Sequence, residues 1–130
     1  MEIKEELRSA TAAFRDAVTK DVRARTTYDT TRRELKDLEQ GLFYDGVLNG
    51  EIDGKNAETR DAQSLLVFRS QEPWRIARDA ALLAEVAYRA SQAEQTIASM
   101  SLKITVVLAN LELGAMGAER LATSVDLAIS

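Results

Sequence analysis

Residues 45–56 read DGVLNGEIDGKN and decide the fold, because they form the one long interruption between two stretches of helical periodicity. Gly46, Gly50 and Gly54 stand among Asp and Asn residues, a composition that favours positive φ angles and local side-chain hydrogen bonds over helix. We expect Gly54 at positive φ and Asn56 as the N-cap of a following helix. The segment therefore predicts a turn over about residues 46–56.

The segment before the turn carries one stripe of residues at helical spacing. Its positions alternate in +4 and +3 steps, which keeps one face of a helix towards a partner helix. The stripe is Ile3, Leu7, Ala10, Phe14, Ala17, Asp21, Ala24, Tyr28, Thr31, Leu35, Leu38 and Leu42. It predicts a helix over about residues 2–45.

A second stripe of the same spacing follows the turn. It comprises Ala62, Leu66, Arg69, Pro73, Ile76, Ala80, Leu83, Ala87, Ala90, Glu94, Ile97, Ser101, Ile104, Leu108 and Leu111. Pro73 predicts a break or kink near residues 70–73, which gives helices over about residues 57–71 and 73–113. The stretch between Lys103 and Leu113 is rich in β-branched residues, so a strand is the alternative to helix there.

The end of the chain is expected to form a separate short element. Gly114 and Gly117 are suited to end the long helix, because glycine is common just beyond a helix C-terminus. A short helix over about residues 118–129 is then predicted, with Leu121, Val125 and Leu127 folding back. The expected fold is all-α and a single domain over residues 1–130: a long antiparallel helical hairpin, coiled-coil-like, with a short C-terminal helix.

Composition excludes several classes of chemistry. The chain has no Cys and no His, which removes disulfides, the usual zinc sites and Ser-His or Cys-His nucleophiles. Seventeen basic and 21 acidic residues give a net charge of −4, without a polybasic arm. The start of the chain lacks a signal-peptide pattern, and the longest apolar region, from Ile104 to Ala118, falls short of the ~20 residues of a membrane span. We expect a cytoplasmic protein without a membrane contact.

The turn resembles two ligand-binding loops without matching either. A phosphate-binding loop needs a longer glycine spacing and a Ser or Thr where Asn56 stands. A calcium loop starting at Asn49 would use Glu51 and Asp53, but it needs a Glu at its twelfth position, which is Arg60. A solvated turn explains the composition better. No catalytic, cofactor or metal residue is therefore predicted.

The remaining candidate residues each have a structural alternative. Glu94 and Asp21, on the stripes, are expected to face a cation across the helix pair or to set the register, rather than to act as acids or bases. The segment between Lys20 and Lys36 could follow a phosphate backbone, although a solvated face of mixed charge is favoured. Trp74 is either an exposed contact or a packing residue beneath the break. The predicted partner contacts are Lys55, Trp74, Arg23, Arg32 and Arg33.

The stretch from Tyr44 to Gln63 resembles a turn found in small helical proteins of bacteriophages and prophages. In those proteins a G-x-I-x-G-K-N-A-x-x-R-x-A-Q-like turn joins a first helix to a long second one. The matching positions are Gly50, Ile52, Gly54, Lys55, Asn56, Ala57, Arg60, Ala62 and Gln63. The resemblance implies a phage-encoded protein in the host cytoplasm, acting in virion assembly, recombination or interference with host defence. It implies no activity and no functional residue.

Taken together, the residues predict a non-enzymatic interaction protein. The second stripe is rich in Ala, so each layer of a two-helix hairpin would bury little apolar surface, and oligomerisation is the expected remedy. Function would then consist of self-association and binding of a protein partner. Two alternatives remain: a recombination or replication accessory touching nucleic acid through Lys20 to Lys36, and an oligomeric sponge for small phosphorylated ligands.

Overall fold

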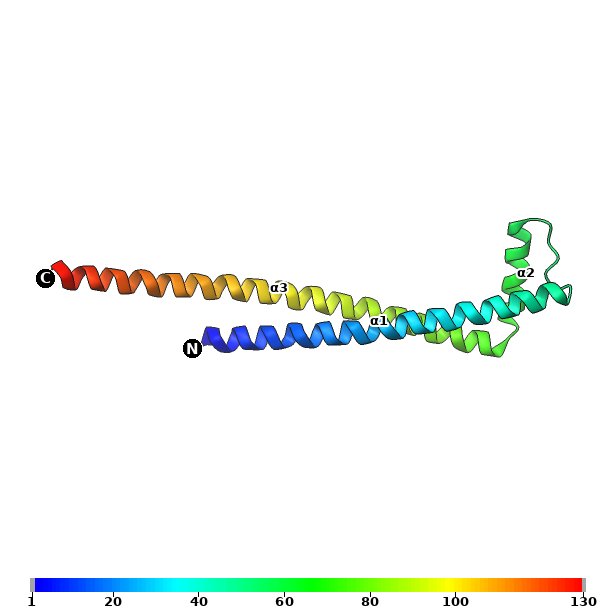
Figure 1. Ribbon diagram of the computed structural model, residues 1–130, viewed down its shortest axis with the longest axis horizontal. Helices are drawn as coiled ribbons and strands as arrows, with labels where there is room; N and C mark the ends of the chain where they lie inside the picture. Colours follow the sequence, from blue (N-terminus) through cyan, green and yellow to red (C-terminus); the bar gives the residue numbers. More distant parts are fainter. Residues whose placement is uncertain (1, 130) are drawn as a thin grey trace. The chain divides into compact units, whose positions relative to one another are not determined.

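The computed structural model describes the backbone of residues 2–129 and the side chains of residues 2–115. It contains three helices, α1 (Glu2–Leu48), α2 (Ala57–Arg69) and α3 (Glu72–Ile129). The long helices α1 and α3 pack antiparallel, and the short α2 connects them (Figure 1). The prediction of an all-α hairpin is confirmed at this level.

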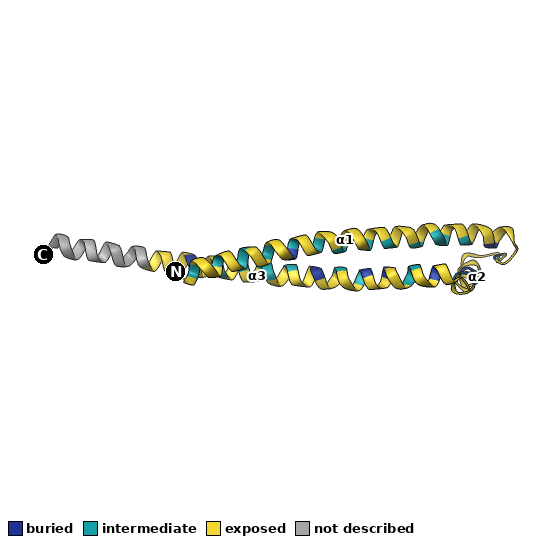
Figure 2. Cartoon of the chain, turned by 90° about the horizontal axis from the view of Figure 1, so that it is seen from below, coloured by how far each residue is buried: buried dark blue, intermediate teal, exposed yellow. Residues whose placement is uncertain are grey.

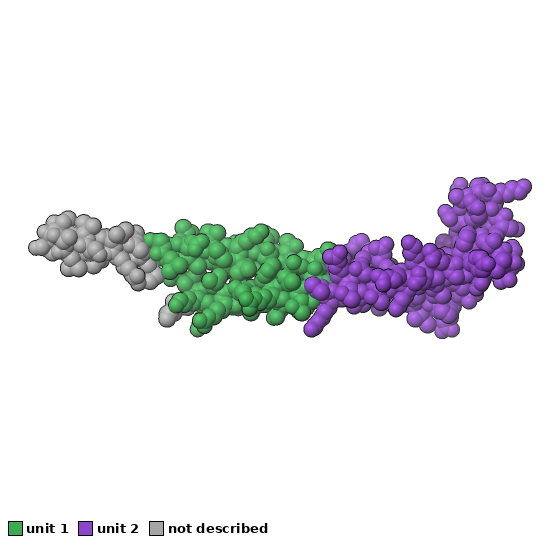
Figure 3. Space-filling view, in the orientation of Figure 1, with its two compact units in different colours: residues 1–21, 91–130 green, residues 22–90 purple. Residues whose placement is uncertain are grey.

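The chain divides into two compact units (Figure 3). Unit 1 is Met1–Asp21 with Ser91–Ser130, and unit 2 is Val22–Ala90. In unit 1, the hydroxyl of Ser91 donates a 2.9 Å hydrogen bond to Oδ1 of Asp21. In unit 2, the ring of Tyr28 stacks on that of Tyr88 with centroids 5.2 Å apart. Each unit therefore has its own specific contacts between α1 and α3.

The face that α1 turns towards α3 is the face that the sequence predicts. Every stripe position from Ile3 to Leu42 is buried or half-buried, and Ala17 is the most buried of them. Gly46, four residues beyond Leu42, is buried as well. In Figure 2 the buried and intermediate colours of α1 lie mainly on its side towards α3. The first stripe is thus confirmed along its whole length.

The face that α3 turns towards α1 differs from the predicted one. All 15 positions of the second predicted stripe, from Ala62 to Leu111, are exposed. The positions that are buried or half-buried at regular spacing are Trp74, Ala77, Ala81, Ala84, Tyr88, Ser91, Gln95, Ala98, Leu102, Thr105 and Ala109. They also alternate in +3 and +4 steps, one residue out of phase with the prediction. The predicted register of α3 is therefore wrong.

Size complementarity accounts for this register. α1 contributes larger side chains, such as Phe14, Leu35 and Leu38, whereas five of the 11 inner positions of α3 are Ala and one is Ser. Small residues let the two backbones approach closely, and bulky side chains from one helix then fill the space over small ones from the other. Among the described residues no large side chain is fully buried, so the core is thin.

Helix α1 ends in a glycine-dependent C-cap. The backbone N–H of Glu51 donates to the carbonyl of Gly46, and that of Gly50 donates to the carbonyl of Val47. This is the Schellman pattern, which requires a left-handed residue at Gly50, and Gly50 has φ +78°. Gly54 lies outside the positive-φ region, so the prediction for Gly54 is wrong: the left-handed residue of the turn is Gly50.

The boundaries around α2 agree with the sequence. Asn56 is the N-cap of α2, since its side chain accepts a 2.8 Å hydrogen bond from the backbone N–H of Thr59. α2 ends at Arg69, where Nη1 of Arg75 donates to the Arg69 carbonyl, and Pro73 is the second residue of α3. A proline is tolerated in a first helical turn because its missing N–H has no partner there anyway. The predicted break near residues 70–73 is confirmed.

Helix α3 is longer than predicted. The stretch from Lys103 to Leu113 is helical, so the strand alternative is wrong. The helix also passes through Gly114, whereas we predicted that it would end there and that a separate helix would begin near residue 118. A glycine inside a helix costs only about 1 kcal/mol relative to alanine, and its neighbours are good helix formers. The predicted fold-back of Leu121, Val125 and Leu127 concerns side chains outside the described residues.

Candidate functional site

The turn before α2 is held together by its own polar groups. Oε1 of Gln63 accepts hydrogen bonds from the backbone N–H groups of Asp53 (3.0 Å) and Gly54 (2.8 Å). The Nε2 group of Gln63 donates to Oδ1 of Asp53 at 2.7 Å. The N–H groups that would face a phosphate, and the carboxylate that would face a cation, are thus partly engaged within the turn. Across the described residues, no three potential metal ligands cluster.

Apolar packing completes the turn. Ile52 is only 4% exposed. A Cβ on Gly46 would lie 2.7 Å from Cδ1 of Ile52, and one on Gly54 would lie 2.7 Å from Cγ2 of Thr59. These positions therefore stay glycine to permit close approach. Five of the nine residues that carry the phage-protein resemblance, Gly50, Ile52, Gly54, Asn56 and Gln63, have such structural roles, so the motif is largely a folding motif.

Lys55 stands apart from this network. Its side chain is exposed, and within the described part of the chain it forms no hydrogen bond or ion pair. Its role as a partner contact stays a prediction.

Trp74 lies beneath the break between α2 and α3. It is 5% exposed, and its Nε1 donates a 3.2 Å hydrogen bond to Oε1 of Glu39. Its ring packs against Phe68, with centroids 5.9 Å apart, and the guanidinium of Arg78 lies 5.1 Å from its centroid. Of the two interpretations of Trp74, this environment favours the packing residue over the exposed contact.

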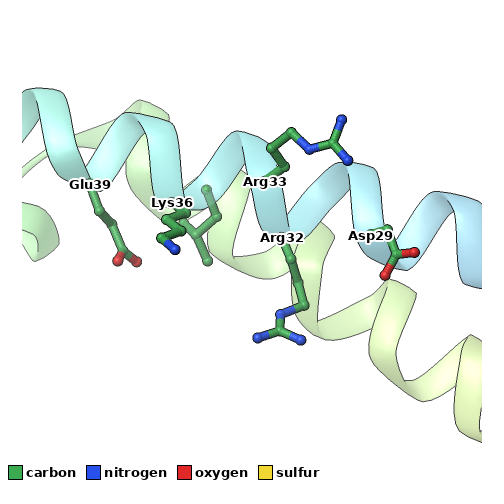
Figure 4. Close-up of a pocket in the computed structure, with 6 residues that line it drawn as sticks. Asp29, Arg32, Arg33, Lys36 and Glu39 are labelled. Atoms are coloured by element: carbon green, nitrogen blue, oxygen red, sulfur yellow. The ribbon is translucent and has the colours of Figure 1, made fainter.

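The basic part of α1 in unit 2 forms an open depression of mixed charge. It is lined by Asp29, Arg32, Arg33, Leu35, Lys36 and Glu39. Figure 4 shows Arg33 pointing away from the side of the helix to which Arg32 and Lys36 point. Arg32 also contacts Tyr28. Its Nη1 donates a 3.0 Å hydrogen bond to the Tyr28 hydroxyl, and its guanidinium carbon lies 5.2 Å from the centroid of the Tyr28 ring.

This depression offers no continuous positive track. Asp29 and Glu39 line the same surface as the cations, and Asp29 lies 4.0 Å from Nε of Arg25. A groove that follows a nucleic-acid backbone needs several cations on one face without interleaved carboxylates. Arg23 is exposed and does not line the depression.

The two acidic stripe residues make contacts across the helix pair in unit 1. A carboxylate oxygen of Glu94 lies 3.8 Å from Nζ of Lys20, and both side chains are more than half exposed. The cation partner that we predicted for Glu94 is confirmed, although Glu94 stands on an exposed face. Asp21 is half-buried and accepts its hydrogen bond from Ser91 rather than from a cation.

The largest unexplained feature of unit 1 is an exposed apolar face on α3. Ile97 and Leu111 are 67% and 65% exposed, and the residues between them at helical spacing are more than one third exposed. We define the outer face of unit 1 as Ile97, Met100, Ser101, Ile104, Val107, Leu108 and Leu111. At 100° per residue it lies roughly 130° around α3 from the inner face. Soluble proteins rarely expose so many neighbouring apolar side chains without a partner.

Sequence reasoning found most of the outer face but assigned it to the hairpin interior. Ile97, Ser101, Ile104, Leu108 and Leu111 all belong to the second predicted stripe. A signal for the correct assignment exists: a second stripe of the same period runs beside it, made of smaller residues that suit the bulky stripe of α1. Met100 and Val107, which widen the outer face, were missed because they fall outside the +4/+3 series.

Unit 2 also exposes apolar side chains. On α3 they are Ile76, Leu82, Leu83 and Val86, and at the end of α1 they are Phe43, Tyr44, Val47 and Leu48. Leu65 and Leu66 of α2 are exposed as well. Both units therefore carry large apolar side chains that are exposed to solvent in the single chain.

One stretch of α3, within Glu72–Ala115, is long enough and apolar enough to cross a membrane, judged by length and composition. Only 6% of that stretch is buried in the structure. The expectation that the longest apolar region falls short of a span is therefore wrong, because the stretch Ile104–Ala118 on which it rested was drawn too short. The range Glu72–Ala115 also contains the outer face of unit 1.

Comparison with models of known families, with characterised proteins and with solved structures found no match for this sequence.

Proposed function

We propose that this chain is a non-enzymatic helical interaction protein that self-associates and binds a protein partner. The observation that carries the proposal is the set of large apolar side chains that α3 leaves exposed at helical spacing. Each such side chain gains roughly 1.5–3 kcal/mol when it is transferred from water into a packed interface. α3 instead packs against α1 through an inner face in which five of 11 positions are Ala, so these larger side chains gain little from burial within one chain.

The thin core supports the same conclusion. The buried apolar residues described in the structure are Ala17, Ile52, Val67, Trp74, Ala81, Ala84 and Ala109, of which four are alanines. Ordering each residue costs on the order of 1–2 kcal/mol of backbone entropy, which so little buried surface offsets poorly. A second chain that covers the exposed faces would supply the missing burial, as in other helical bundles.

The test is the molar mass in solution. We expect light scattering coupled to size-exclusion chromatography, at 1–100 µM loading concentrations, to give a mass of at least twice 14.4 kDa. Sedimentation velocity over the same concentration range would measure the equilibrium between the monomer and the oligomer. A compact, stable monomer at every concentration would contradict the proposal.

We further propose that the protein belongs with small phage-encoded helical proteins and acts in the cytoplasm. The support is the resemblance of the turn sequence between Gly50 and Gln63 to the turn of those proteins. Most of the matching residues hold the turn together. Lys55 and Arg60 match as well and have exposed side chains. The identity of the neighbouring genes tests the origin. Fractionation of cells that express the chain tests the location, since recovery with the membrane would contradict it.

A further inference from the structure

We propose that the outer face of unit 1 is the dimer interface, and that it pairs antiparallel with the same face of a second copy about a twofold axis at Ile104. This inference rests on the proposed self-association and specifies its surface and geometry. The occupant of the outer face is thus a second copy of this chain. Three features of the face support this assignment.

The first feature is self-complementarity. Around Ile104, the seven residues of the outer face map onto each other when the sequence direction is reversed. Ile97 then meets Leu111 of the second copy, Met100 meets Leu108, and the small Ser101 meets Val107. Ile104 meets its own copy on the axis. A twofold interface requires this property, because the same surface must serve on both sides.

The second feature is area. Ile97, Met100, Ile104, Val107, Leu108 and Leu111 are each 50–67% exposed. Together they expose on the order of 600 Å² per copy, at the upper end of apolar patches on monomers and approaching the ~800 Å² per partner of a standard interface. Lys103 is the one charged residue between Ile97 and Leu111, and its position falls outside the face. The face can therefore be desolvated without burying a charge.

The third feature selects the antiparallel direction. Glu94 is the next position of the seam beyond Ile97. A parallel, in-register pair would place Glu94 opposite its own copy in the seam, where like charges repel. The antiparallel pair places Glu94 opposite Gly114 of the second copy instead. Gly114 has no side chain, and the space where its Cβ would stand has no atom within 4 Å, so the Glu94 side chain has room there.

A lipid bilayer is the competing occupant, and α1 argues against it. In unit 1 the inner face of α3 packs on α1, whose side chains there include exposed charges at Glu5, Glu6, Arg8 and Arg15. If α3 crossed a membrane in this fold, α1 would carry those charges into the hydrocarbon, at about 2.5–3.5 kcal/mol for each at the centre of the bilayer. Pairing of two outer faces leaves them all in water.

Cysteine cross-linking tests the geometry, and the chain has no cysteine of its own. We expect Ile104→Cys to form covalent dimers with a short bismaleimide. Ile97→Cys alone should not, because antiparallel pairing holds the two copies of residue 97 about 21 Å apart. A mixture of Ile97→Cys and Leu111→Cys should form the mixed dimer. Val106→Cys is the matched control, two residues from the axis but on the other side of α3.

A second variant measures the energetics. Ile104→Lys places two like charges on the axis, so we expect it to raise the dimer dissociation constant at least tenfold. Val106→Lys should leave the constant within twofold. Circular dichroism of both variants separates loss of dimer from loss of helix.

The outcomes are distinguishable. A wild-type monomer would overturn the proposed function and this inference together. A dimer in which Ile97→Cys cross-links to itself, or in which Val106→Cys cross-links as well as Ile104→Cys, would overturn only this inference. Flotation of the protein with phosphatidylcholine vesicles, with no dimer in their absence, would assign the face to lipid and also overturn it.

Discussion

Tyr28 of α1 and Tyr88 of α3 stack with ring centroids 5.2 Å apart and planes inclined by 30°. On α3 the neighbouring inner positions towards the turn are the alanines Ala81 and Ala84, so this aromatic pair is the bulkiest contact in its part of the helix interface. Shifting either helix by one residue would separate the rings. The pair therefore helps to set the register of α1 and α3 in unit 2.

A double-mutant cycle on Tyr28 and Tyr88 is expected to give a coupling energy of about 0.5–1.5 kcal/mol, the range found for aromatic pairs. The measurement is urea unfolding of the wild type, Tyr28→Ala, Tyr88→Ala and the double variant. Additive effects of the two single substitutions would show that the stacking contributes nothing to stability.

Enlarging an alanine distinguishes the observed register of α3 from the predicted one. Ala84 is buried on the inner face, whereas Ala87 belongs to the predicted stripe and is exposed. We expect Ala84→Leu to destabilise the protein by about 1–3 kcal/mol through overpacking, and Ala87→Leu to cost less than about 0.5 kcal/mol. Thermal unfolding of both variants at one protein concentration makes the comparison. The reverse order would restore the predicted register.

Replacing Trp74 tests the packing under the break. Trp74→Ala removes the contact with Phe68 and the hydrogen bond to Glu39, so a loss of about 3 kcal/mol is expected. Glu39→Gln is the matched control, because the amide oxygen can still accept from Nε1, and its cost should stay within about 0.5 kcal/mol. Chemical unfolding followed by circular dichroism measures both. A Trp74→Ala variant as stable as the wild type would indicate that Trp74 is not a core residue.

Two glycines of α1 should respond in opposite directions to alanine. At Gly41, inside the helix, an added Cβ meets nothing within 4 Å, so Gly41→Ala should stabilise by about 0.5–1 kcal/mol. At Gly50 the backbone has φ +78°, so Gly50→Ala should destabilise by about 1–2 kcal/mol. Urea midpoints with unchanged slopes would report both shifts. Equal effects at the two positions would mean that the C-cap of α1 is not formed.

The hydrogen bonds of Gln63 and Asn56 should stabilise the turn before α2. Gln63→Ala removes the acceptor for two backbone N–H groups, and Asn56→Ala removes the N-cap, so each should cost about 1 kcal/mol. Lys55→Ala serves as the control and should leave stability unchanged. Loss of partner binding in Lys55→Ala, with an unchanged melt, would locate a contact at the turn. If Gln63→Ala and Asn56→Ala also leave the melting temperature unchanged, the turn is not held by these bonds.

The sequence by itself determined the elements and much of their chemistry. Few and clustered glycines, one proline and an unbroken +4/+3 stripe are local properties, and local properties specify helices, caps and breaks. For this reason the inner face of α1, the N-cap at Asn56 and the break near Pro73 were all predictable. Gly114 was misjudged because the cost of one internal glycine is small beside the helix propensity of its neighbours.

Only the tertiary structure decided which face of α3 packs against α1. α3 carries two adjacent stripes of the same period, and periodicity cannot rank them, because both satisfy it equally. Sequence reasoning chose the stripe with larger apolar residues, such as Leu83 and Ile104. The choice depends on the partner: α1 presents bulky side chains, which fill the space over the small stripe containing Ala84 and Ser91. The larger stripe is left in solvent for that reason, and the outer face of unit 1 is its consequence.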